Sequence, residues 1–194
     1  MNSAQLLRTY DATYYLRKVE GWREFAQRRL TAKRRELLGN IDFFGKSVLD
    51  VGFGRGEVAQ YCYDNGASVV GIDYSPVAWA IARKYCDPGV KLHIFSIEKL
   101  PTLRGVGPFD IVLVLDVLEH VADWEAQILA REVERRARPG CLVYVLTPAD
   151  IRRGQYRGMH ITQWNFRKLN ALFAGFEPIE WKMGGDLYVV YRHP

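Results

Sequence analysis

Two histidines and two carboxylates occupy positions that could carry proton transfer or bind a metal ion. Asp116, Glu119 and His120 are separated by offsets of three and four residues, which place side chains on one face of a helical turn. Histidine is the side chain used most often as a general base, so His120 is our first candidate for that role and His160 our second. Glu119 could orient the His120 ring or favour its protonated form. For both histidines the alternative is a structural residue at a loop or helix end.

These side chains also suggest a second kind of chemistry. Two carboxylates and an imidazole are ligands that Mg²⁺, Mn²⁺ or a similar ion can use. The alternative metal set is Asp116, Glu119, His120 and His160. We expect no metal site, and we keep this set as the alternative.

A separate group of residues is typical of a nucleotide-type cofactor loop. Gly52, Gly54 and Gly56 separate the apolar run 47–51 from a helical pattern. Glycines in a strand-to-helix turn let the backbone bend sharply and let a ligand approach closely. A second apolar run ends on Asp73, 21 residues after Gly52, close to the spacing at which a carboxylate reaches ribose hydroxyls. The alternative is a tight turn without a ligand.

The residue Glu57 helps to choose between cofactors. A dinucleotide fingerprint has glycine at this position, beside the pyrophosphate. A carboxylate at the helix start would repel a pyrophosphate, but it is compatible with S-adenosylmethionine, which carries no phosphate. The segment 50–56, Asp-Val-Gly-Phe-Gly-Arg-Gly, resembles the first motif of the Rossmann-like S-adenosylmethionine-dependent methyltransferases. The resemblance implies S-adenosylmethionine as cofactor and S-adenosylhomocysteine as product.

Further segments resemble the same family in the same order, so the resemblance covers about residues 46–181. Residues 109–121 resemble the fourth-strand motif F-D-x-V-x-x-x-x-V-L-E-H-V of the small-molecule type, which includes enzymes of ubiquinone biosynthesis. Residues 95–101 resemble the adenine-binding segment G-D-A-E-x-L-P, with Ser96 in place of its acidic residue. Residues 138–148 resemble the K-P-G-G turn and fifth strand. The resemblance implies cofactor contacts at Asp50, Gly52, Phe53, Gly54, Asp73, Tyr74, Ser96, Ile97 and Leu115.

The resemblance also bears on metal binding and on the N-terminus. Some RNA 2′-O-methyltransferases and ubiquinone-type enzymes have a similar Glu-x-x-Glu-His motif with a later histidine. Here Asp116 stands at the first position. Tyr14 and Tyr15 resemble residues of an N-terminal segment that lies over the cofactor in many such enzymes, so they are lid candidates. Plain packing of the two aromatic rings is the alternative.

The elements that position these residues predict an α/β fold of the Rossmann-like methyltransferase type. We expect one domain over residues 1–194, with an N-terminal lid segment and helix at 1–40 and the core at 46–194. The core would be a mostly parallel seven-stranded sheet with helices on both faces. Gly184-Gly185 predicts a turn between the last two strands, which would form an antiparallel hairpin.

Three helices are predicted from apolar spacing. They span residues 19–38, with Trp22 in the apolar stripe and a basic opposite face, residues 122–138, with Trp124 in the apolar set, and residues 161–174. The basic face of the first helix is interpreted as solvated.

Composition favours an ordinary globular protein in a reducing compartment. Hydrophobic residues make up 48% and charged residues 25%, and the net charge is +5. The three cysteines have no C-x-x-C spacing, which indicates neither a disulfide framework nor a zinc knuckle. No apolar run is long enough to cross a bilayer, and the N-terminus lacks the plan of a signal peptide. We therefore predict a cytoplasmic protein that does not insert into membranes.

Three functions remain open from the sequence. The first is methyl transfer to a small-molecule acceptor, such as a hydroxyl of a sugar, quinone or natural product. The second is an RNA methyltransferase, including metal-assisted 2′-O-methylation, that uses the basic helix and the arginines of residues 152–157. The third is a non-catalytic cofactor-binding module. We expect the first function, with no nucleic-acid partner.

Overall fold

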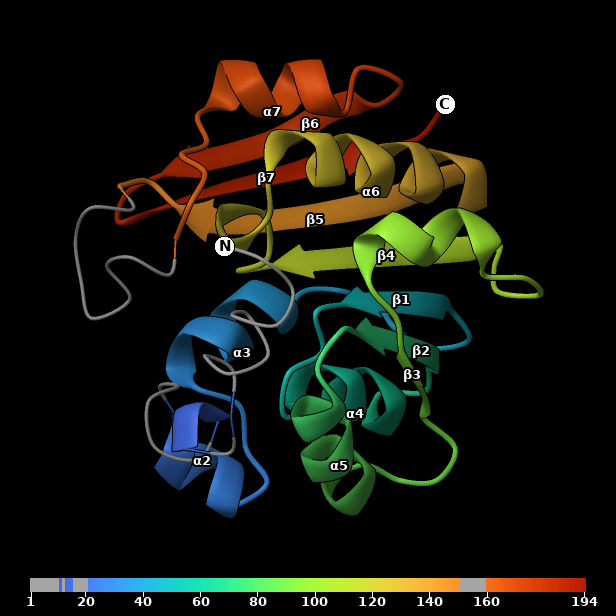
Figure 1. The fold of residues 1–194 in the computed structure, drawn as a ribbon, viewed down its shortest axis with the longest axis vertical. Coiled ribbons are helices and arrows are strands. Elements are labelled where there is room, and N and C mark those ends of the chain that lie inside the picture. The colour runs from blue at the N-terminus through green and yellow to red at the C-terminus, as the bar shows by residue number, and fades with distance from the viewer. Residues whose placement is uncertain (1–10, 12, 16–20, 151–159) are drawn as a thin grey trace. The chain divides into compact units, whose positions relative to one another are not determined.

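The computed structural model describes residues 11, 13–15, 21–150 and 160–194. Its strands form a seven-stranded sheet in the order β3-β2-β1-β4-β5-β7-β6 (Figure 1). The predicted fold class is confirmed: the sheet is mostly parallel and ends in an antiparallel hairpin, with helices around it. Among the described residues, no helix has the length and apolar character needed to cross a bilayer.

The chain divides into two compact units, which we describe separately. The first unit consists of Met1–Lys46 and Phe53–Phe95, and the second of Ser47–Gly52 and Ser96–Pro194. The prediction of a single domain stays a prediction.

The first unit carries the parallel pair β2 (Ser68–Asp73) and β3 (Lys91–Ile94). The helix α4 (Glu57–Asp64) follows the glycine loop, and α5 (Pro76–Tyr85) follows β2. The N-terminus of α5 is capped as a proline-led helix should be, because the Ser75 side chain accepts a hydrogen bond from the main chain of the first turn. Ser75 and Pro76 together therefore determine where α5 begins after β2.

The single helix predicted over residues 19–38 is wrong. The described part forms two short helices, α2 (Trp22–Ala26) and α3 (Ala32–Leu38). Arg28 has a left-handed backbone with φ of 54°, which no α-helix accommodates. Thr31 then caps α3 with its side chain, and a β-branched hydroxyl residue is better suited to a cap than to a helix interior.

The second unit carries β1 (Ser47–Val51) and β4 (Phe109–Leu115), which pair in parallel, and β5 (Ala137–Pro148), which continues the parallel sheet. The antiparallel strands β7 (Asp186–Arg192) and β6 (Glu177–Met183) complete it beyond β5, with β7 paired to both. The expected hairpin at Gly184-Gly185 is therefore present. Within β4 every residue after the first two is buried, as expected for a strand covered on both faces.

Helical segments of the second unit lie beside these strands. They are the 3₁₀ turns η2 (Ile97–Thr102) and η3 (Leu118–His120) and the helices α6 (Asp123–Arg136) and α7 (Phe166–Leu172). Figure 1 shows α6 and α7 in front of the strands β5, β6 and β7. The turn η3 joins β4 to α6, and it carries the first histidine of the candidate site.

Two further expectations from helical spacing are wrong. The helix predicted over 161–174 begins only at Phe166, where the Asn165 side chain caps it. Ile161 lies outside the helix, and its N–H donates at 2.7 Å to the Glu119 carbonyl in η3. Trp22 and Trp124, both assigned to apolar stripes, are 43% and 53% exposed.

Candidate active site

The end of β4 forms a turn that brings η3 to the carboxyl edge of the parallel strands. Asp116 leaves the strand with a left-handed φ of 57°, and its N–H donates at 2.8 Å to the carbonyl of Leu146 on β5. The His120 N–H then bonds the Val117 carbonyl at 3.0 Å and closes the 3₁₀ turn. Because ligands of open parallel sheets bind beyond this edge, the turn lies where chemistry is expected.

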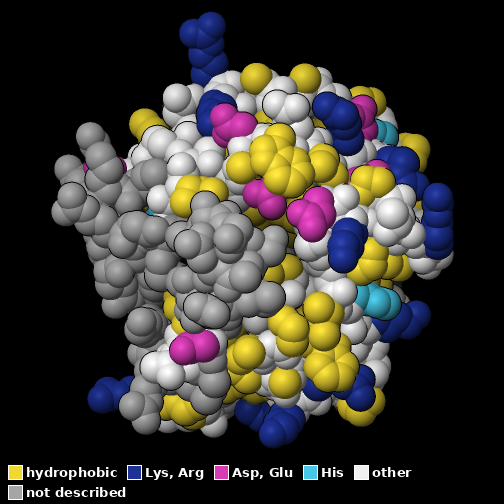
Figure 2. Space-filling model, viewed as in Figure 1, with side chains coloured by type: hydrophobic (Ala, Val, Ile, Leu, Met, Phe, Trp, Pro, Cys, Tyr) yellow, Lys and Arg dark blue, Asp and Glu magenta, His cyan; other side chains and the backbone are white. Residues whose placement is uncertain are grey.

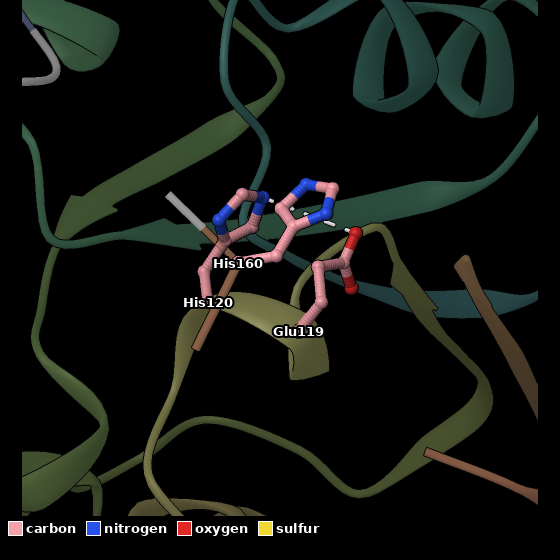
Figure 3. Close-up of side chains that lie close together, drawn as sticks. All are labelled: Glu119, His120 and His160. Carbon is pink, nitrogen blue, oxygen red and sulfur yellow. Dashed lines mark ion pairs between the residues drawn. The ribbon is translucent and has the colours of Figure 1, made fainter. Parts of the chain in front are cut away.

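Three side chains predicted from the sequence lie together at this turn. Glu119, His120 and His160 each offer one ligand atom, and these atoms all lie within 4.8 Å of one another. Figure 3 shows the carboxylate and the two imidazole rings close together. One oxygen of Glu119 lies 3.9 Å from Nε2 of His120, and the two rings meet edge to face with centroids 4.8 Å apart. The second unit alone therefore contains the complete cluster.

Glu119 is the buried member of the cluster. Only 1% of its surface is exposed, and its Oε2 accepts a hydrogen bond of 3.1 Å from the hydroxyl of Thr147 at the end of β5. Its main-chain carbonyl accepts from the N–H groups of Ile161 and Thr162 at 2.7 and 3.2 Å. Glu119 thus fixes both its own carboxylate and the segment that directly follows His160.

His160 has an environment that favours the neutral ring. Burial lowers its pKa below the usual value for histidine, and the nearby Asp116 carboxylate offsets part of that effect. A neutral imidazole can accept a proton or bind a metal ion through a ring nitrogen. Asp116 is not a member of the three-residue cluster, although its charge reaches His160.

The first unit holds the predicted ribose carboxylate. The two oxygens of Asp73 accept 2.9 Å hydrogen bonds from the N–H groups of Gly54 and Ser75. Burial nevertheless raises the pKa of Asp73 to about 6, against the opposing effect of main-chain hydrogen bonds from Ser75, Gly54 and Tyr74. A carboxylate has about four lone-pair sites, so Asp73 keeps the capacity to accept from a ribose. These acceptor oxygens fit the hydroxyls of a ribose such as that of S-adenosylmethionine.

The glycine at the end of β1 has a backbone that other residues would strain. Gly52 has φ of 73°, and a Cβ at this position would lie 2.6 Å from Cγ2 of Val117. The predicted cofactor residues are distributed over both units. Phe53, Gly54, Asp73 and Tyr74 belong to the first, and Asp50, Gly52, Ser96, Ile97 and Leu115 belong to the second. Within the first unit, Gly54 and Asp73 are in direct contact.

Two residues, one in each unit, have no role in the sequence-based prediction. Thr147 bonds Glu119, and its only sequence signal is a hydroxyl at the end of a strand that reaches the ligand edge. Arg55 lies inside the glycine motif and forms an ion pair with Glu57. The Glu57 charge is therefore partly compensated, which weakens its repulsion of a phosphate compared with an unpaired carboxylate.

Known proteins with similar sequences are methyltransferases. The methyltransferase domain family matches residues 22–177. The ubiquinone biosynthesis O-methyltransferase of Pseudomonas paraeruginosa is 37% identical over 110 residues, which cover 53% of this chain and 44% of that protein. The enzyme of the same name from Aromatoleum aromaticum is 36% identical over 111 residues, covering 56% and 46%. The chain thus matches a little under half the length of these curated relatives.

Solved structures with the same fold extend the comparison to nearly the whole chain. A TehB-like S-adenosylmethionine-dependent methyltransferase from Corynebacterium glutamicum has a TM-score of 0.74 at 16% identity, covering 95% of this chain and all of that one. The 1,6-didemethyltoxoflavin-N1-methyltransferase of Burkholderia thailandensis has a TM-score of 0.69 at 20% identity, covering 98% and 88%. At these identities the likeness concerns the fold.

The fold and the sequence motifs together define the class: a Rossmann-like S-adenosylmethionine-dependent methyltransferase, as the sequence resemblance implied. The chain belongs to the methyltransferase domain family.

Proposed function

We propose that the protein transfers a methyl group from S-adenosylmethionine to a hydroxyl of a small-molecule acceptor. The observation that carries this proposal is the cluster of Glu119, His120 and His160 at the carboxyl edge of the strands, in a chain of the methyltransferase domain family. A non-catalytic module would have no need of two imidazoles beside a buried carboxylate.

Asp73 is the proposed ribose-binding residue. S-adenosylmethionine supplies an electrophilic methyl group on a sulfonium sulfur and leaves as S-adenosylhomocysteine. The Asp73 carboxylate would accept from the ribose hydroxyls, while its bonds to Gly54 and Ser75 hold it in place. The remaining predicted cofactor residues are proposed for the same ligand. They are Asp50, Gly52, Phe53, Tyr74, Ser96, Ile97 and Leu115.

His120 is the proposed general base for the acceptor. It would take the proton of the acceptor hydroxyl as the oxygen attacks, a contribution of about 10²–10⁴-fold in rate. Glu119 would orient the ring and stabilise the imidazolium that forms, because its oxygen lies 3.9 Å from Nε2. His160, held neutral by burial, would help to position the acceptor or receive the proton.

The proposed acceptor is a hydroxylated small molecule such as a quinol, a sugar or another natural product. Relatives named as ubiquinone biosynthesis O-methyltransferases support oxygen as the methylated atom. Figure 2 shows Lys and Arg side chains on one face of the molecule, among apolar and acidic side chains.

A second candidate mechanism uses a divalent cation at the same cluster. Three ligand atoms within 4.8 Å of one another, from two imidazoles and one carboxylate, suit Mn²⁺ or a similar ion. In that mechanism Glu119, His120 and His160 would be ligands, and the cation would lower the pKa of the acceptor hydroxyl.

One experiment tests the function and separates the mechanisms. The purified protein is incubated with S-adenosylmethionine and a panel of catechols, quinols and sugars, and methylated products are identified by mass spectrometry. Transfer to oxygen that persists in EDTA supports His120 as a base. Transfer that stops in EDTA and returns with Mn²⁺ or Mg²⁺ supports the cation. Failure of the whole panel, together with efficient methylation of RNA, would contradict a small-molecule acceptor.

A further inference from the structure

Arg55 is a buried cation in the middle of the glycine loop. Only 3% of its surface is exposed, and its guanidinium is paired with the carboxylate of Glu57. The same guanidinium lies over the ring of Phe25 on α2, 4.8 Å from its centroid. It also donates at 3.4 Å to the main-chain carbonyl of Tyr15. One side chain of the cofactor loop therefore contacts two separate parts of the N-terminal region.

Tyr15 in turn lies close enough to Asp73 for the two groups to interact electrostatically. Its ring is 5% exposed, and its phenol shares a hydrogen bond with the side chain of Ser75. Burial and the nearby Asp73 carboxylate raise the pKa of Tyr15 far above its usual value, so the phenol stays neutral. Ser75 also donates its N–H to Asp73. Tyr15, Ser75 and Asp73 thus form one connected polar group.

The helix α2 is held to the first unit by a stack that continues from Arg55. Phe25 stacks on Tyr85, the last residue of α5, with centroids 4.6 Å apart and an angle of 18° between the rings. The Arg28 guanidinium lies over the Tyr85 ring, 4.8 Å from the centroid, and donates a hydrogen bond to the Tyr85 carbonyl. Each ring of the stacked pair therefore also contacts one guanidinium group, an arrangement that cation–π attraction favours.

We propose that Arg55 is a positioning residue that keeps Tyr15 beside the Ser75–Asp73 pair, so that bound cofactor leaves only when the contact between Arg55 and Tyr15 opens. This inference rests on the proposed binding of S-adenosylmethionine at Asp73. The glycine loop would then do more than approach the cofactor, because the Arg55 side chain links the loop to the Tyr15 main chain. Glu57 and Phe25 fix the guanidinium, and the guanidinium fixes the Tyr15 main chain.

The shape of the guanidinium is essential to this role. A planar group can pair with a carboxylate at its edge while its face lies on an aromatic ring, and a lysine ammonium offers neither geometry. Arg55→Lys should therefore recover the charge beside Glu57 but only part of the positioning.

The test is the dissociation rate of S-adenosylhomocysteine, measured by stopped-flow displacement with the full chain. Arg55→Gln should accelerate dissociation roughly tenfold, the effect of losing one favourable charged contact. Arg55→Lys should fall between that variant and the wild type. The matched control is Arg23→Gln, an exposed arginine on α2, which should change the rate less than about twofold.

A double-mutant cycle with Tyr15→Ala asks whether Arg55 acts through Tyr15. Tyr15→Ala should also accelerate dissociation, and adding Arg55→Gln should then change the rate little further. A rate for Arg55→Gln within twofold of the wild type, or effects of the two substitutions that simply multiply, would overturn the proposal. If Arg55→Gln does not fold, Phe25→Leu removes the ring beneath the guanidinium and is expected to act in the same direction.

Hydrogen exchange of the ligand-free protein separates failure of this inference from failure of the proposed cofactor. The Tyr14 and Tyr15 N–H groups donate to Asp11, at 2.8 and 3.3 Å. Arg55→Gln should speed exchange of these amides, whereas Arg23→Gln should not. Faster exchange in a protein that binds no S-adenosylhomocysteine would refute only the cofactor. Unchanged exchange in a protein that binds it would refute only the role of Arg55.

Discussion

The Glu119 carboxylate and the Thr147 hydroxyl form a 3.1 Å hydrogen bond in the interior of the second unit, where the two residues are 1% and 0% exposed. This bond occupies Oε2 and leaves Oε1 on the side of His120, 3.9 Å from Nε2. A threonine at the end of β5 therefore sets the orientation of the carboxylate that orients the imidazole.

Thr147→Val should lower stability and activity together. Valine keeps the shape of threonine but leaves a buried carboxylate oxygen without its donor, which costs about 1–3 kcal/mol. Urea unfolding monitored by circular dichroism should show a decrease in the free energy of unfolding of that size. Thr147→Ser keeps the hydroxyl and is the matched control. Equal stability of the Val and Ser variants would mean that the hydrogen bond contributes nothing.

His120→Ala should reduce turnover while leaving cofactor binding intact. If His120 is the base, kcat should fall by about 10²–10⁴-fold, with the affinity for S-adenosylhomocysteine within about twofold of the wild type. His93→Gln, a substitution on β3 of the first unit, is the control for a histidine without a role in transfer. Full activity of His120→Ala in the presence of EDTA would exclude both the base and the metal-ligand role.

Cofactor binding should depend on pH through Asp73. The pKa of Asp73 in the folded protein, about 6, lies above that of an exposed aspartate. The protonated Asp73 therefore contributes to the free energy of unfolding at low pH, and this contribution is lost as the pH rises through 6. The affinity for the cofactor should depend on pH in the opposite direction, because the ribose hydroxyls donate to the charged carboxylate. This affinity should fall roughly tenfold for each pH unit below 6. Calorimetry of S-adenosylhomocysteine binding between pH 5 and 8, in buffers of different ionisation enthalpy, should detect proton release. Asp73→Asn should abolish both effects, and a flat profile for the wild type would show that Asp73 does not titrate on binding.

RNA should bind weakly to the basic residues of the N-terminal helices. Arg28 is engaged with Tyr85, and α2 and α3 do not form the continuous basic helix that the sequence suggested. Phosphate contacts would make the affinity fall steeply with salt. Tight binding of a short RNA that is lost on raising the salt, and on reversing the charges of Arg29 and Arg35, would refute this prediction.

Local sequence signals predicted most of the fold. Ser75-Pro76 indicated the start of α5, the apolar run after Phe109 indicated a doubly covered strand, and Gly184-Gly185 indicated the hairpin. Each of these signals acts within a few residues, where propensity and capping decide the structure. The residues of the histidine cluster were also predicted, because strand ends of a parallel sheet share one edge.

Contacts between residues far apart in sequence could not be predicted in this way. An arginine has no local preference for the left-handed backbone that interrupts the helix at Arg28, and its side chain bonds Tyr85, 57 positions away. Thr147 and Glu119 are separated by 28 positions, and Arg55 and Tyr15 by 40. Such pairs form only in the folded chain, so spacing carries no signal for them.

We propose above all that this chain binds S-adenosylmethionine through Asp73. The most direct test is a calorimetric titration of the wild type and of Asp73→Ala with S-adenosylhomocysteine at pH 7.5, and of the wild type with NADH. The wild type should bind S-adenosylhomocysteine and not NADH, and Asp73→Ala should bind it roughly tenfold or more weakly, since a hydrogen bond to a charged group contributes about 1.5–3 kcal/mol. Unchanged affinity in Asp73→Ala, or preferential binding of NADH by the wild type, would contradict the account.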